Sequence, residues 1–330
     1  MRTKILYIER NFWKNAGIEQ VFRTLAENLN SDRFTTEFQT VKYKSSVTDT
    51  LKNILFFKTK KADIYHITGQ IHYIALLLPR ERTVLTIHDL IFLHTKKGLR
   101  RYILKKLFLD IPVRRLRYIT AISEFTKQEI IRHSGCAPEK IKVIENPLFE
   151  QFTVGAEYKF NARHPLILQI GTALNKNLDN LVEALRGLKC GLKIIGRIDN
   201  RLREKIKSYK IDFQNEYDLS EEQIIEEYRK ADVISFCSTY EGFGLPIIEA
   251  QALRRLVITS NISPLKEVAG DGAFLVNPFD TTDMHSGFRE VFNNERLRRK
   301  LISNGLRNIK RFSARKIAGQ YEGFYKDILT

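Results

Sequence analysis

The segment from Ser238 to Ala250 holds the residues whose types and spacing are best suited to chemistry. We expect an apolar strand to end at Ser238 and a helix to begin after a glycine-rich turn, with Pro246 at the first helical position, where its missing N–H costs nothing. The start of a helix presents N–H groups and the positive end of the helix dipole. Glu241 precedes the turn, and the carboxylate of Glu249 can accept two hydrogen bonds from a vicinal diol. The segment therefore predicts a receptor for hydroxyl groups and phosphate.

The same stretch resembles the E-x7-E motif of family 4 of the retaining glycosyltransferases, which have the GT-B fold. The resemblance implies that Glu241 contacts the transferred sugar and that Glu249 binds the ribose of a nucleotide-sugar donor. It also implies that the intervening loop holds sugar hydroxyls and phosphate through its backbone. The donor-binding residues of this loop are Gly242, Phe243, Gly244 and Leu245. By itself the spacing fits two unrelated glutamates, one on the surface and one at a helix start, as well as it fits a binding site. The place of the motif between a strand and a helix favours the binding site.

A second match lies in residues 167–185, a strand, loop and helix in which the family holds the donor diphosphate with a basic residue. Lys176 matches that residue, and its charge would stabilise the leaving phosphate. Gly171 and Thr172 open the loop and are also expected to bind the donor. The family often has an arginine where Thr172 stands. Arg197, after a later strand, could replace part of the missing charge or be an ordinary loop residue.

The N-terminal half offers weaker signals. Gly17, in the turn Asn15–Ala16–Gly17, stands where the family has a glycine-rich turn near the phosphates. His88 follows a predicted strand where the family has a histidine that touches the donor sugar. The resemblance therefore implies that His88 bonds a sugar hydroxyl or positions the acceptor. Satisfied structural roles are favoured for His66 and His72.

No Asp-x-Asp occurs in the chain, and no group of His, Asp and Glu has the spacing of a metal site. Lys176 and backbone amides are expected to replace a divalent metal, so we expect no cofactor, and the nucleotide sugar is a co-substrate. Neither Glu241 nor Glu249 has an evident partner for glycoside hydrolysis. The resemblance implies retention by front-face attack, in which the departing phosphate oxygen takes the proton of the incoming hydroxyl.

Short apolar runs alternate with helical patterns along the chain, which indicates an α/β protein with parallel, doubly wound sheets. Such sheets bind ligands at the carboxyl ends of their strands. The predicted strands are residues 4–10, 38–41, 62–68, 83–89, 118–123, 140–147, 165–171, 191–196, 232–238, 256–260 and 273–278. The predicted helices are residues 18–29, 124–133, 178–188, 220–231, 245–255, 282–311 and 313–329.

A chain of 330 residues exceeds the usual size of one core. We expect two Rossmann-like domains with an interdomain cleft. The resemblance implies that residues 1–155 bind the acceptor and residues 156–312 the nucleotide sugar. Residues 313–330 are expected to form a helix that packs back on the N-terminal domain. Periodicity is lost over residues 149–163, which predicts the linker.

The formal charge is +17, and most of the excess lies in residues 1–150. Residues 98–113 predict a basic amphipathic helix, which suits an anionic membrane surface where each cation contributes about 1 kcal/mol. The cations expected to face the membrane are Arg100, Arg101, Lys105 and Lys106. A core-packed helix with a solvated basic face is the alternative. No nucleic-acid-binding motif is present, so nucleic acid is not an expected partner.

The apolar runs fall short of a membrane helix, and the charged start is unlike a signal peptide. Three widely spaced cysteines indicate buried thiols in a reducing compartment. We therefore expect a cytoplasmic protein at the inner face of the cytoplasmic membrane, transferring a hexosyl group to a glycan or lipid-linked acceptor in envelope polysaccharide biosynthesis. The alternatives are a catalytically silent nucleotide-sugar-binding protein, a GT-B-type nucleotide-sugar epimerase and a basic nucleic-acid-binding protein.

Overall fold

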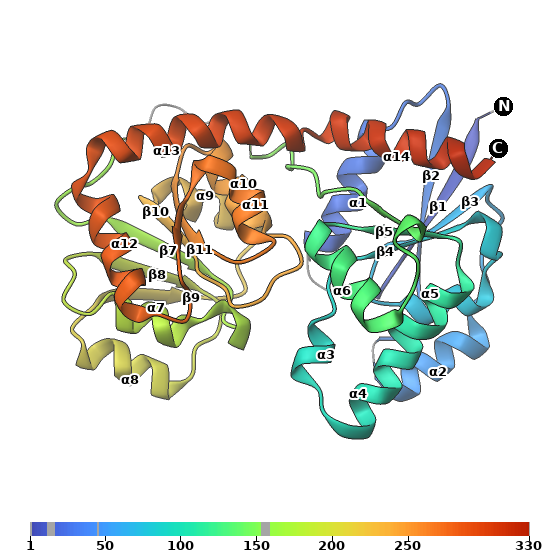
Figure 1. The fold of residues 1–330 in the computed structure, drawn as a ribbon, viewed down its shortest axis with the longest axis horizontal. Helices are drawn as coiled ribbons and strands as arrows, with labels where there is room; N and C mark the ends of the chain where they lie inside the picture. Colours follow the sequence, from blue (N-terminus) through green and yellow to red (C-terminus); the bar gives the residue numbers. More distant parts are fainter. Residues whose placement is uncertain (1, 12–16, 45, 153–158, 330) are drawn as a thin grey trace. The chain divides into compact units, whose positions relative to one another are not determined.

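The computed structural model describes residues 2–11, 17–44, 46–152 and 159–329. The chain divides into two compact units (Figure 1). Unit 1 comprises residues 1–149 and 312–330, and unit 2 comprises residues 150–311. The first division falls six residues before the expected boundary at residue 155, and the second lies at Phe312, within one residue of the expected start of the last helix.

Unit 1 contains a parallel sheet with the strand order β2-β1-β3-β4-β5-β6. Its strands are β1 (Thr3–Glu9), β2 (Phe34–Thr40), β3 (Ile64–Ile67), β4 (Thr83–Ile87), β5 (Tyr118–Ala121) and β6 (Ile141–Val143). The central strands β3 and β4 are buried along their whole length, because helices cover both faces of a doubly wound sheet. This burial explains why their sequences, IYHI and TVLTI, place apolar side chains on both faces of the sheet.

The helices of unit 1 flank this sheet (Figure 1). They are α1 (Gly17–Asn28), α2 (Val47–Phe56), α3 (Ile91–Thr95), α4 (Gly98–Lys105), α5 (Ile111–Arg115), α6 (Glu124–Ser134) and α14 (Ala314–Leu329). A π-helical turn, Lys106–Asp110, joins α4 to α5. The C-terminal helix α14 belongs to unit 1, where its Tyr325 hydroxyl lies 2.7 Å from the ring of His66 and Glu322 accepts a hydrogen bond from the Asn30 N–H.

Unit 2 contains a second parallel sheet, with the strand order β12-β11-β10-β7-β8-β9. Its strands are β7 (Leu166–Ile170), β8 (Gly191–Ile195), β9 (Asp212–Glu216), β10 (Val233–Phe236), β11 (Leu256–Ser260) and β12 (Phe274–Val276). Its helices are α7 (Leu178–Ala184), α8 (Asn200–Ser208), α9 (Glu221–Lys230), α10 (Leu245–Ala252), α11 (Leu265–Ala269), α12 (Thr281–Asn293) and α13 (Glu295–Asn308). The strand order reverses between β7 and β10, and such switch points are where open α/β sheets bind ligands.

The prediction of one helix over residues 282–311 is wrong, because the structure has two, α12 and α13. Asn294 lies between them with an extended backbone, and its side chain accepts a hydrogen bond from the Leu297 N–H. An asparagine that caps the second helix in this way ends the first one. Helices α2, α3, α8 and α11 and strand β9 were not predicted. Helices α2 and α8 each begin after a capping side chain, Ser46 and Asp199 respectively.

Candidate functional site

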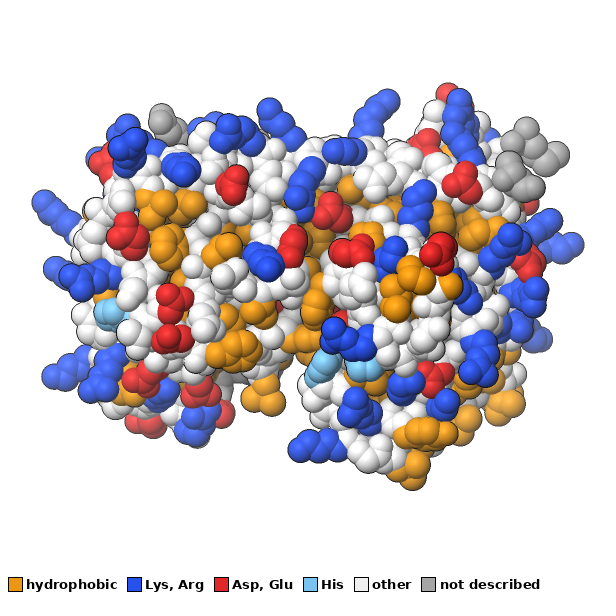
Figure 2. Space-filling model, viewed as in Figure 1, with side chains coloured by type: hydrophobic (Ala, Val, Ile, Leu, Met, Phe, Trp, Pro, Cys, Tyr) orange, Lys and Arg blue, Asp and Glu red, His pale blue; other side chains and the backbone are white. Residues whose placement is uncertain are grey.

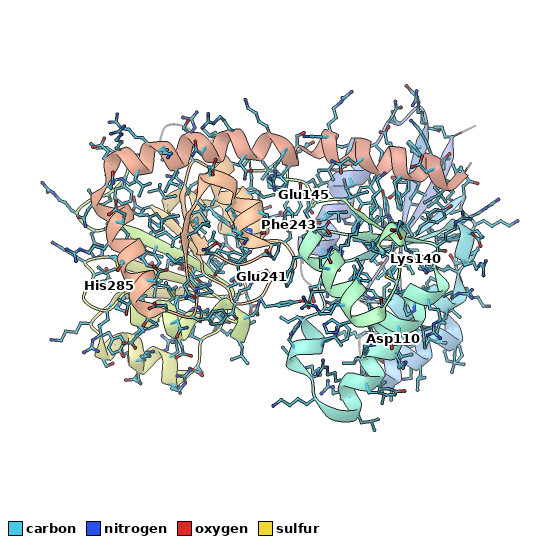
Figure 3. The ribbon with its side chains drawn as sticks, viewed as in Figure 1. Asp110, Lys140, Glu145, Glu241, Phe243 and His285 are labelled. Atoms are coloured by element: carbon cyan, nitrogen blue, oxygen red, sulfur yellow. The ribbon has the colours of Figure 1, made fainter. Side chains whose placement is uncertain are left out.

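Lys176 and Glu241 form an ion pair in unit 2, although 65 residues separate them in the chain. The Lys176 Nζ lies 2.6 Å from Glu241 Oε1, and both side chains are largely shielded from solvent. Lys176 follows β7 and Glu241 follows β10, and these two strands are neighbours at the switch point of the sheet. The fold thus brings together two of the three residues predicted to be catalytic. Glu241 lies in the loop between β10 and α10 (Figure 3).

The position of Lys176 depends on Gly171, which has a positive φ of 84°. A Cβ atom added to Gly171 would lie 3.2 Å from the Lys176 Cε, so a larger residue would crowd the lysine side chain. The Lys176 ammonium also lies 4.6 Å from the centre of the Phe236 ring, a favourable cation–π distance. Glycine at position 171 therefore leaves room for the lysine to lie along the loop and reach Glu241.

Two asparagines that the sequence analysis did not select hold this pair of loops together. Asn175 donates hydrogen bonds to the Tyr240 carbonyl at 2.9 Å and to Glu241 Oε1 at 3.1 Å. Asn177 has a positive φ of 61° and donates to the carbonyls of Cys237 and Pro278. The signal that would have found them is the Asn-Lys-Asn sequence directly before a helix, since asparagine tolerates this backbone conformation and bonds nearby backbone groups.

The loop after Glu241 turns sharply into α10. Gly244 has a φ of 122°, and a Cβ atom there would lie 2.9 Å from the side chain of Leu265, so only glycine fits without displacement. Phe243 is buried, which anchors the loop in unit 2, and Gly242 and Leu245 are half-buried. Pro246 occupies the second helical position instead of the first that was expected. The four loop residues predicted to bind the donor therefore surround the start of one helix.

Glu249 lies in α10 and is 9% exposed. The Tyr228 hydroxyl donates a hydrogen bond of 2.6 Å to Glu249 Oε2. Burial raises the pKa of Glu249 from 4.5 to about 7, and the bond from Tyr228 partly offsets this effect. Tyr228 comes from α9, and no sequence motif singled it out. Glu249 is thus a carboxyl group whose charge changes near neutral pH.

Two buried polar atoms at the same edge of the sheet have no hydrogen-bond partner among the described residues. These are Gln169 Oε1 on β7 and Ser238 Oγ just after β10. Buried polar groups in proteins are nearly always paired with protein, water or ligand atoms. Their position at the carboxyl ends of β7 and β10 marks this edge as a place for water or a polar ligand.

Arg197 has partners other than the Lys176–Glu241 pair. It follows β8, and its guanidinium lies 2.8 Å from an Asp218 carboxylate oxygen and 4.3 Å from the Tyr217 ring centre. Thr172 packs against Gly196, where a Cβ atom would come within 2.7 Å of the Thr172 methyl group. Within the described part of the chain, no ion pair or hydrogen bond joins either residue to Glu241, whereas Lys176 forms an ion pair with it.

His88 lies directly after β4 in unit 1 and is 4% exposed. Its Nε2 lies 2.8 Å from the Thr68 carbonyl. A carbonyl can only accept, so Nε2 carries the proton and Nδ1 is the acceptor nitrogen. Burial lowers the pKa of His88 to about 4. The ring is therefore a neutral hydrogen-bond acceptor at neutral pH and a weak base. Gly17 is the first residue of α1 and is exposed, whereas Asn15 and Ala16 lie outside the described residues.

Two further histidines of unit 1, His66 and His72, have structural partners, as the sequence favoured. His66 is fully buried between the hydroxyls of Tyr325 and Thr86, each at 2.7 Å. His72 is buried and contacts the Phe108 carbonyl. Desolvation by burial lowers the pKa of both rings.

The basic segment of unit 1 is only partly as predicted. Arg100 and Arg101 are exposed on α4 together with Leu99, Tyr102 and Ile103. Figure 2 shows basic and apolar side chains mixed over this part of the surface, at the lower right. Lys105 and Lys106 instead form ion pairs with Asp110, at 2.5 and 3.0 Å. Because Asp110 lies one turn further along the helix, it partly neutralises these two lysines. None of the described helices is long and apolar enough to cross a membrane.

The fold brings together one group of His and Glu side chains that no spacing in the sequence indicated. His94, Glu129 and His133 each place a possible ligand atom within 4.8 Å of the others. His94 lies on α3, and 35 residues separate it from Glu129 on α6. Sequence spacing could not reveal the group because it depends on the packing of α3 against α6.

Two family models match the chain. The model described as "Glycosyl transferases group 1" matches residues 153–308, and "Glycosyltransferase Family 4" matches residues 38–148. Among curated proteins, the chain is 27% identical to the O-antigen chain mannosyltransferase RfbU of Salmonella typhimurium, over 67% of this chain and 63% of that protein. It is also 27% identical to the capsular polysaccharide biosynthesis glycosyltransferase CapM of Staphylococcus aureus, over 86% and 82%. The chain spans less than two thirds of the length of the first of these relatives.

Among solved structures, Anabaena HepE in complex with UDP and glucose is similar to this chain with a TM-score of 0.80. The match covers 99% of this chain and 100% of that one at 16% identity. This likeness shows that the two doubly wound units have the GT-B fold.

Proposed function

The chain belongs to the group 1 glycosyltransferases, family 4, and on this premise we propose that it transfers a hexosyl group from a nucleotide sugar to a glycan or lipid-linked acceptor in envelope polysaccharide biosynthesis. The relatives named above support the choice of acceptor class. The observation that carries the proposal is the Lys176–Glu241 pair beside the start of α10. A cation, a carboxylate and a helix N-terminus together suit a diphosphate that is linked to a sugar.

Unit 2 holds the donor in this proposal. Lys176 and the amides around Gly244 receive the diphosphate, and Glu241 receives hydroxyl groups of the sugar. Glu249 accepts hydrogen bonds from the ribose hydroxyls. Arg197 supplies a further positive charge at the same edge of the sheet when its contact with Asp218 opens. The remaining donor contacts are assigned to Gly171, Thr172, Gly242, Phe243 and Leu245 in unit 2.

Unit 1 holds the acceptor, and His88 positions it. The neutral ring of His88 accepts a hydrogen bond through Nδ1, which suits a sugar or acceptor hydroxyl. Its low pKa makes it a poor general base near neutral pH. The proton of the attacking hydroxyl therefore needs another acceptor.

We propose that the configuration of the anomeric carbon is retained and that no metal is needed for transfer. The acceptor oxygen forms a bond to the anomeric carbon on the face from which the phosphate departs. The bond between that carbon and the phosphate oxygen breaks, and this oxygen takes the proton of the acceptor hydroxyl. Lys176 stabilises the negative charge that accumulates on the phosphate, which is preorganised electrostatic catalysis.

The first experiment is a thermal-shift screen of the full chain with UDP-, GDP-, ADP- and dTDP-sugars. A ligand at 100 times its dissociation constant adds about 2.7 kcal/mol to the unfolding free energy, so the correct donor will raise Tm measurably. Transfer by the selected donor is then followed by mass spectrometry, in chelator, and the anomeric configuration of the product is read by NMR. An inverted product or an absolute metal requirement would refute this mechanism.

The screen also separates the proposal from its rivals. A silent binding protein would be stabilised by a donor and would neither transfer nor hydrolyse it. An epimerase would consume the donor without an acceptor. A nucleic-acid-binding protein would bind DNA or RNA with a steep salt dependence and ignore the donors.

We also propose that α4 binds the anionic inner face of the cytoplasmic membrane through Arg100, Arg101 and the exposed Leu99. The substitution Arg100→Glu/Arg101→Glu is expected to weaken binding to vesicles that contain phosphatidylglycerol by about 30-fold or more, since each lost cation costs about 1 kcal/mol. Vesicle co-sedimentation at low salt measures this.

The matched control is Arg296→Glu/Lys300→Glu, which makes the same charge change on exposed positions of α13 in unit 2. Equal losses in both double variants would mean that only net charge matters. That result, or unchanged binding in the α4 variant, would exclude α4 as the contact surface.

A further inference from the structure

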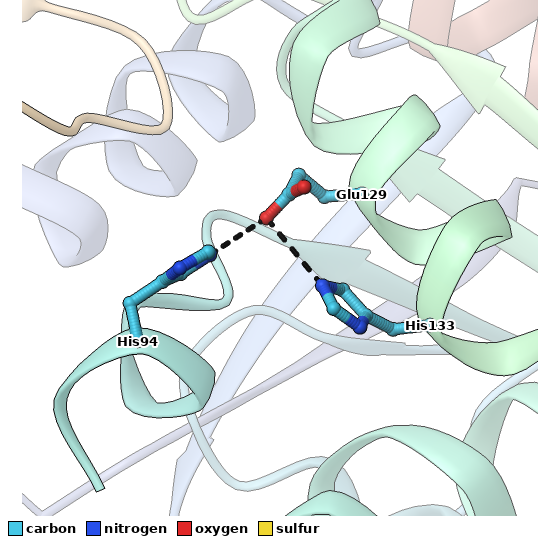
Figure 4. A group of neighbouring side chains, drawn as sticks. All are labelled: His94, Glu129 and His133. Carbon is cyan, nitrogen blue, oxygen red and sulfur yellow. Dashed lines mark hydrogen bonds and ion pairs between the residues drawn. The ribbon is translucent and has the colours of Figure 1, made fainter.

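Three side chains of unit 1 converge on one point between α3 and α6 (Figure 4). His94 Nε2 lies 2.8 Å from Glu129 Oε2, and His133 Nε2 lies 3.8 Å from the same oxygen. Glu129 is 4% exposed, whereas the side chain of His94 is 46% exposed. Among the described residues this is the only group of three or more His, Cys, Asp or Glu side chains whose ligand atoms are all mutually close.

We propose that His94, Glu129 and His133 bind a divalent transition-metal ion, with Zn²⁺ as the best fit. Two imidazoles and one carboxylate are a ligand set that zinc takes in proteins, with a water molecule in the fourth position. Zinc ligand bonds of about 2.0–2.2 Å in a tetrahedron place neighbouring ligand atoms roughly 3.3–3.6 Å apart. Glu129 Oε2 lies 2.8 and 3.8 Å from the two imidazole nitrogens, on either side of this spacing. All three ligand atoms lie within 4.8 Å of one another, so side-chain movements would complete the site.

The surroundings of Glu129 favour binding through one oxygen. Arg132 lies 3.2 Å from Glu129 Oε1, which leaves Oε2 directed at the two histidines. Hydrogen bonds of this kind to a ligating carboxylate orient it toward the metal. Glu129 and His133 lie four residues apart on α6 and therefore share one face of the helix.

The ion would fasten α3 to α6 and so fix the segment that follows His88. Thr126, one turn before Glu129 on α6, already donates a hydrogen bond to the His88 carbonyl at 3.3 Å. The metal would add a second connection between this helix and the same segment. Its role is thus structural, and it lies in unit 1, whereas the proposed diphosphate-binding residues lie in unit 2. Sugar transfer without added metal is compatible with this site.

The test uses the full chain without a histidine tag, freed of metal with a chelator and then titrated with Zn²⁺ or Co²⁺ in a calorimeter. We expect one ion per chain and the intense visible absorption of tetrahedral Co²⁺. Because loss of an outer partner alone costs 10–100-fold, His94→Ala and His133→Ala are each expected to weaken binding at least about 100-fold. Zn²⁺ should raise the Tm of the unmodified chain and not that of His94→Ala.

The matched control is His164→Ala, which removes a histidine about as exposed as His94. His164 lies 3.8 Å from the Asp212 carboxylate. It should bind Zn²⁺ as the unmodified chain does. Because His94 is exposed, His94→Ala should have the same Tm as the unmodified chain when both are in chelator. His133→Ala tests the same site with a second variant. No binding, equal binding by His94→Ala and the unmodified chain, or a cobalt spectrum with thiolate charge transfer would each overturn the proposal.

Discussion

Replacing Lys176 by alanine is expected to lower kcat by about 100- to 1,000-fold, the usual cost of removing one preorganised charge-stabilising group. Lys176 is held in place by its ion pair with Glu241 and by the Phe236 ring. Gly171 has no side chain and leaves room for the lysine. It therefore needs no reorganisation when charge develops on the leaving phosphate. The KM for the donor should change much less than kcat, because the charge grows only as the bond to the anomeric carbon breaks.

Initial rates at varied donor concentration measure the separate effects on kcat and on the KM for the donor. Lys176→Arg is expected to recover only part of the loss, since the planar guanidinium differs in shape from an ammonium group. The matched control is Arg201→Ala, which removes an exposed cation of unit 2 that pairs with Asp179 and should leave kcat unchanged.

Glu241→Ala should also remove most turnover, and the double variant Lys176→Ala/Glu241→Ala tests the coupling between the two residues. Because the side chains are in contact, their effects are not expected to add. Full activity in the double variant would rule out the proposed mechanism.

Replacing Glu249 by alanine is expected to weaken donor binding by about 100-fold, since hydrogen bonds to a charged acceptor contribute roughly 1.5–3 kcal/mol each. The kcat at saturating donor should stay within a few-fold of the unmodified enzyme, because the ribose contacts are the same in the ground and transition states. Titration calorimetry with the nucleotide sugar and saturation kinetics give the two quantities. A large loss of kcat with unchanged affinity would refute the ribose-binding role.

Donor affinity should also depend on pH through Glu249, whose pKa burial raises to about 7. The ionised carboxylate is the better acceptor for ribose hydroxyls, so the affinity should increase about tenfold between pH 6 and pH 8 as the charged fraction rises. A nucleotide sugar is the right probe because its diphosphate does not titrate in this range. Glu249→Gln should remove most of the pH dependence, and a Glu249→Gln profile as steep as that of the unmodified chain would contradict the assignment.

The raised pKa of Glu249 also affects stability. The free energy of unfolding should fall as the pH rises, whereas donor affinity should rise. The folded pKa of about 7 lies above the ordinary value of 4.5, so between these pH values the folded chain holds more protons than the unfolded chain. Glu249 therefore contributes stability that is complete below about pH 4.5 and is lost as the pH rises through about 7. The loss is roughly 3 kcal/mol. Urea unfolding at pH 5 and pH 8 should show Glu249→Gln to be less sensitive to pH than the unmodified chain.

The sequence by itself determined the class of fold and the local form of the loop between β10 and α10. Alternation of buried strands with amphipathic helices predicted two doubly wound sheets, and the similarity to known structures confirms the GT-B fold. The turn before α10 was also predicted, because Gly244 and Pro246 specify the backbone through their own conformational limits. The break between α12 and α13 was missed because a single capping residue, Asn294, outweighs a continuous helical pattern.

Tertiary structure alone decided which of the selected residues meet. Lys176 reaches Glu241 because β7 and β10 are neighbours in the sheet, and Arg197 instead pairs with Asp218. The charge state of Glu249 depends on its burial and on Tyr228 from another helix, and His94 joins Glu129 and His133 only where α3 packs on α6. Backbone form follows from neighbours along the chain, whereas ion pairs, desolvation and ligand sets depend on distances between residues remote in sequence, which only packing of the whole unit establishes.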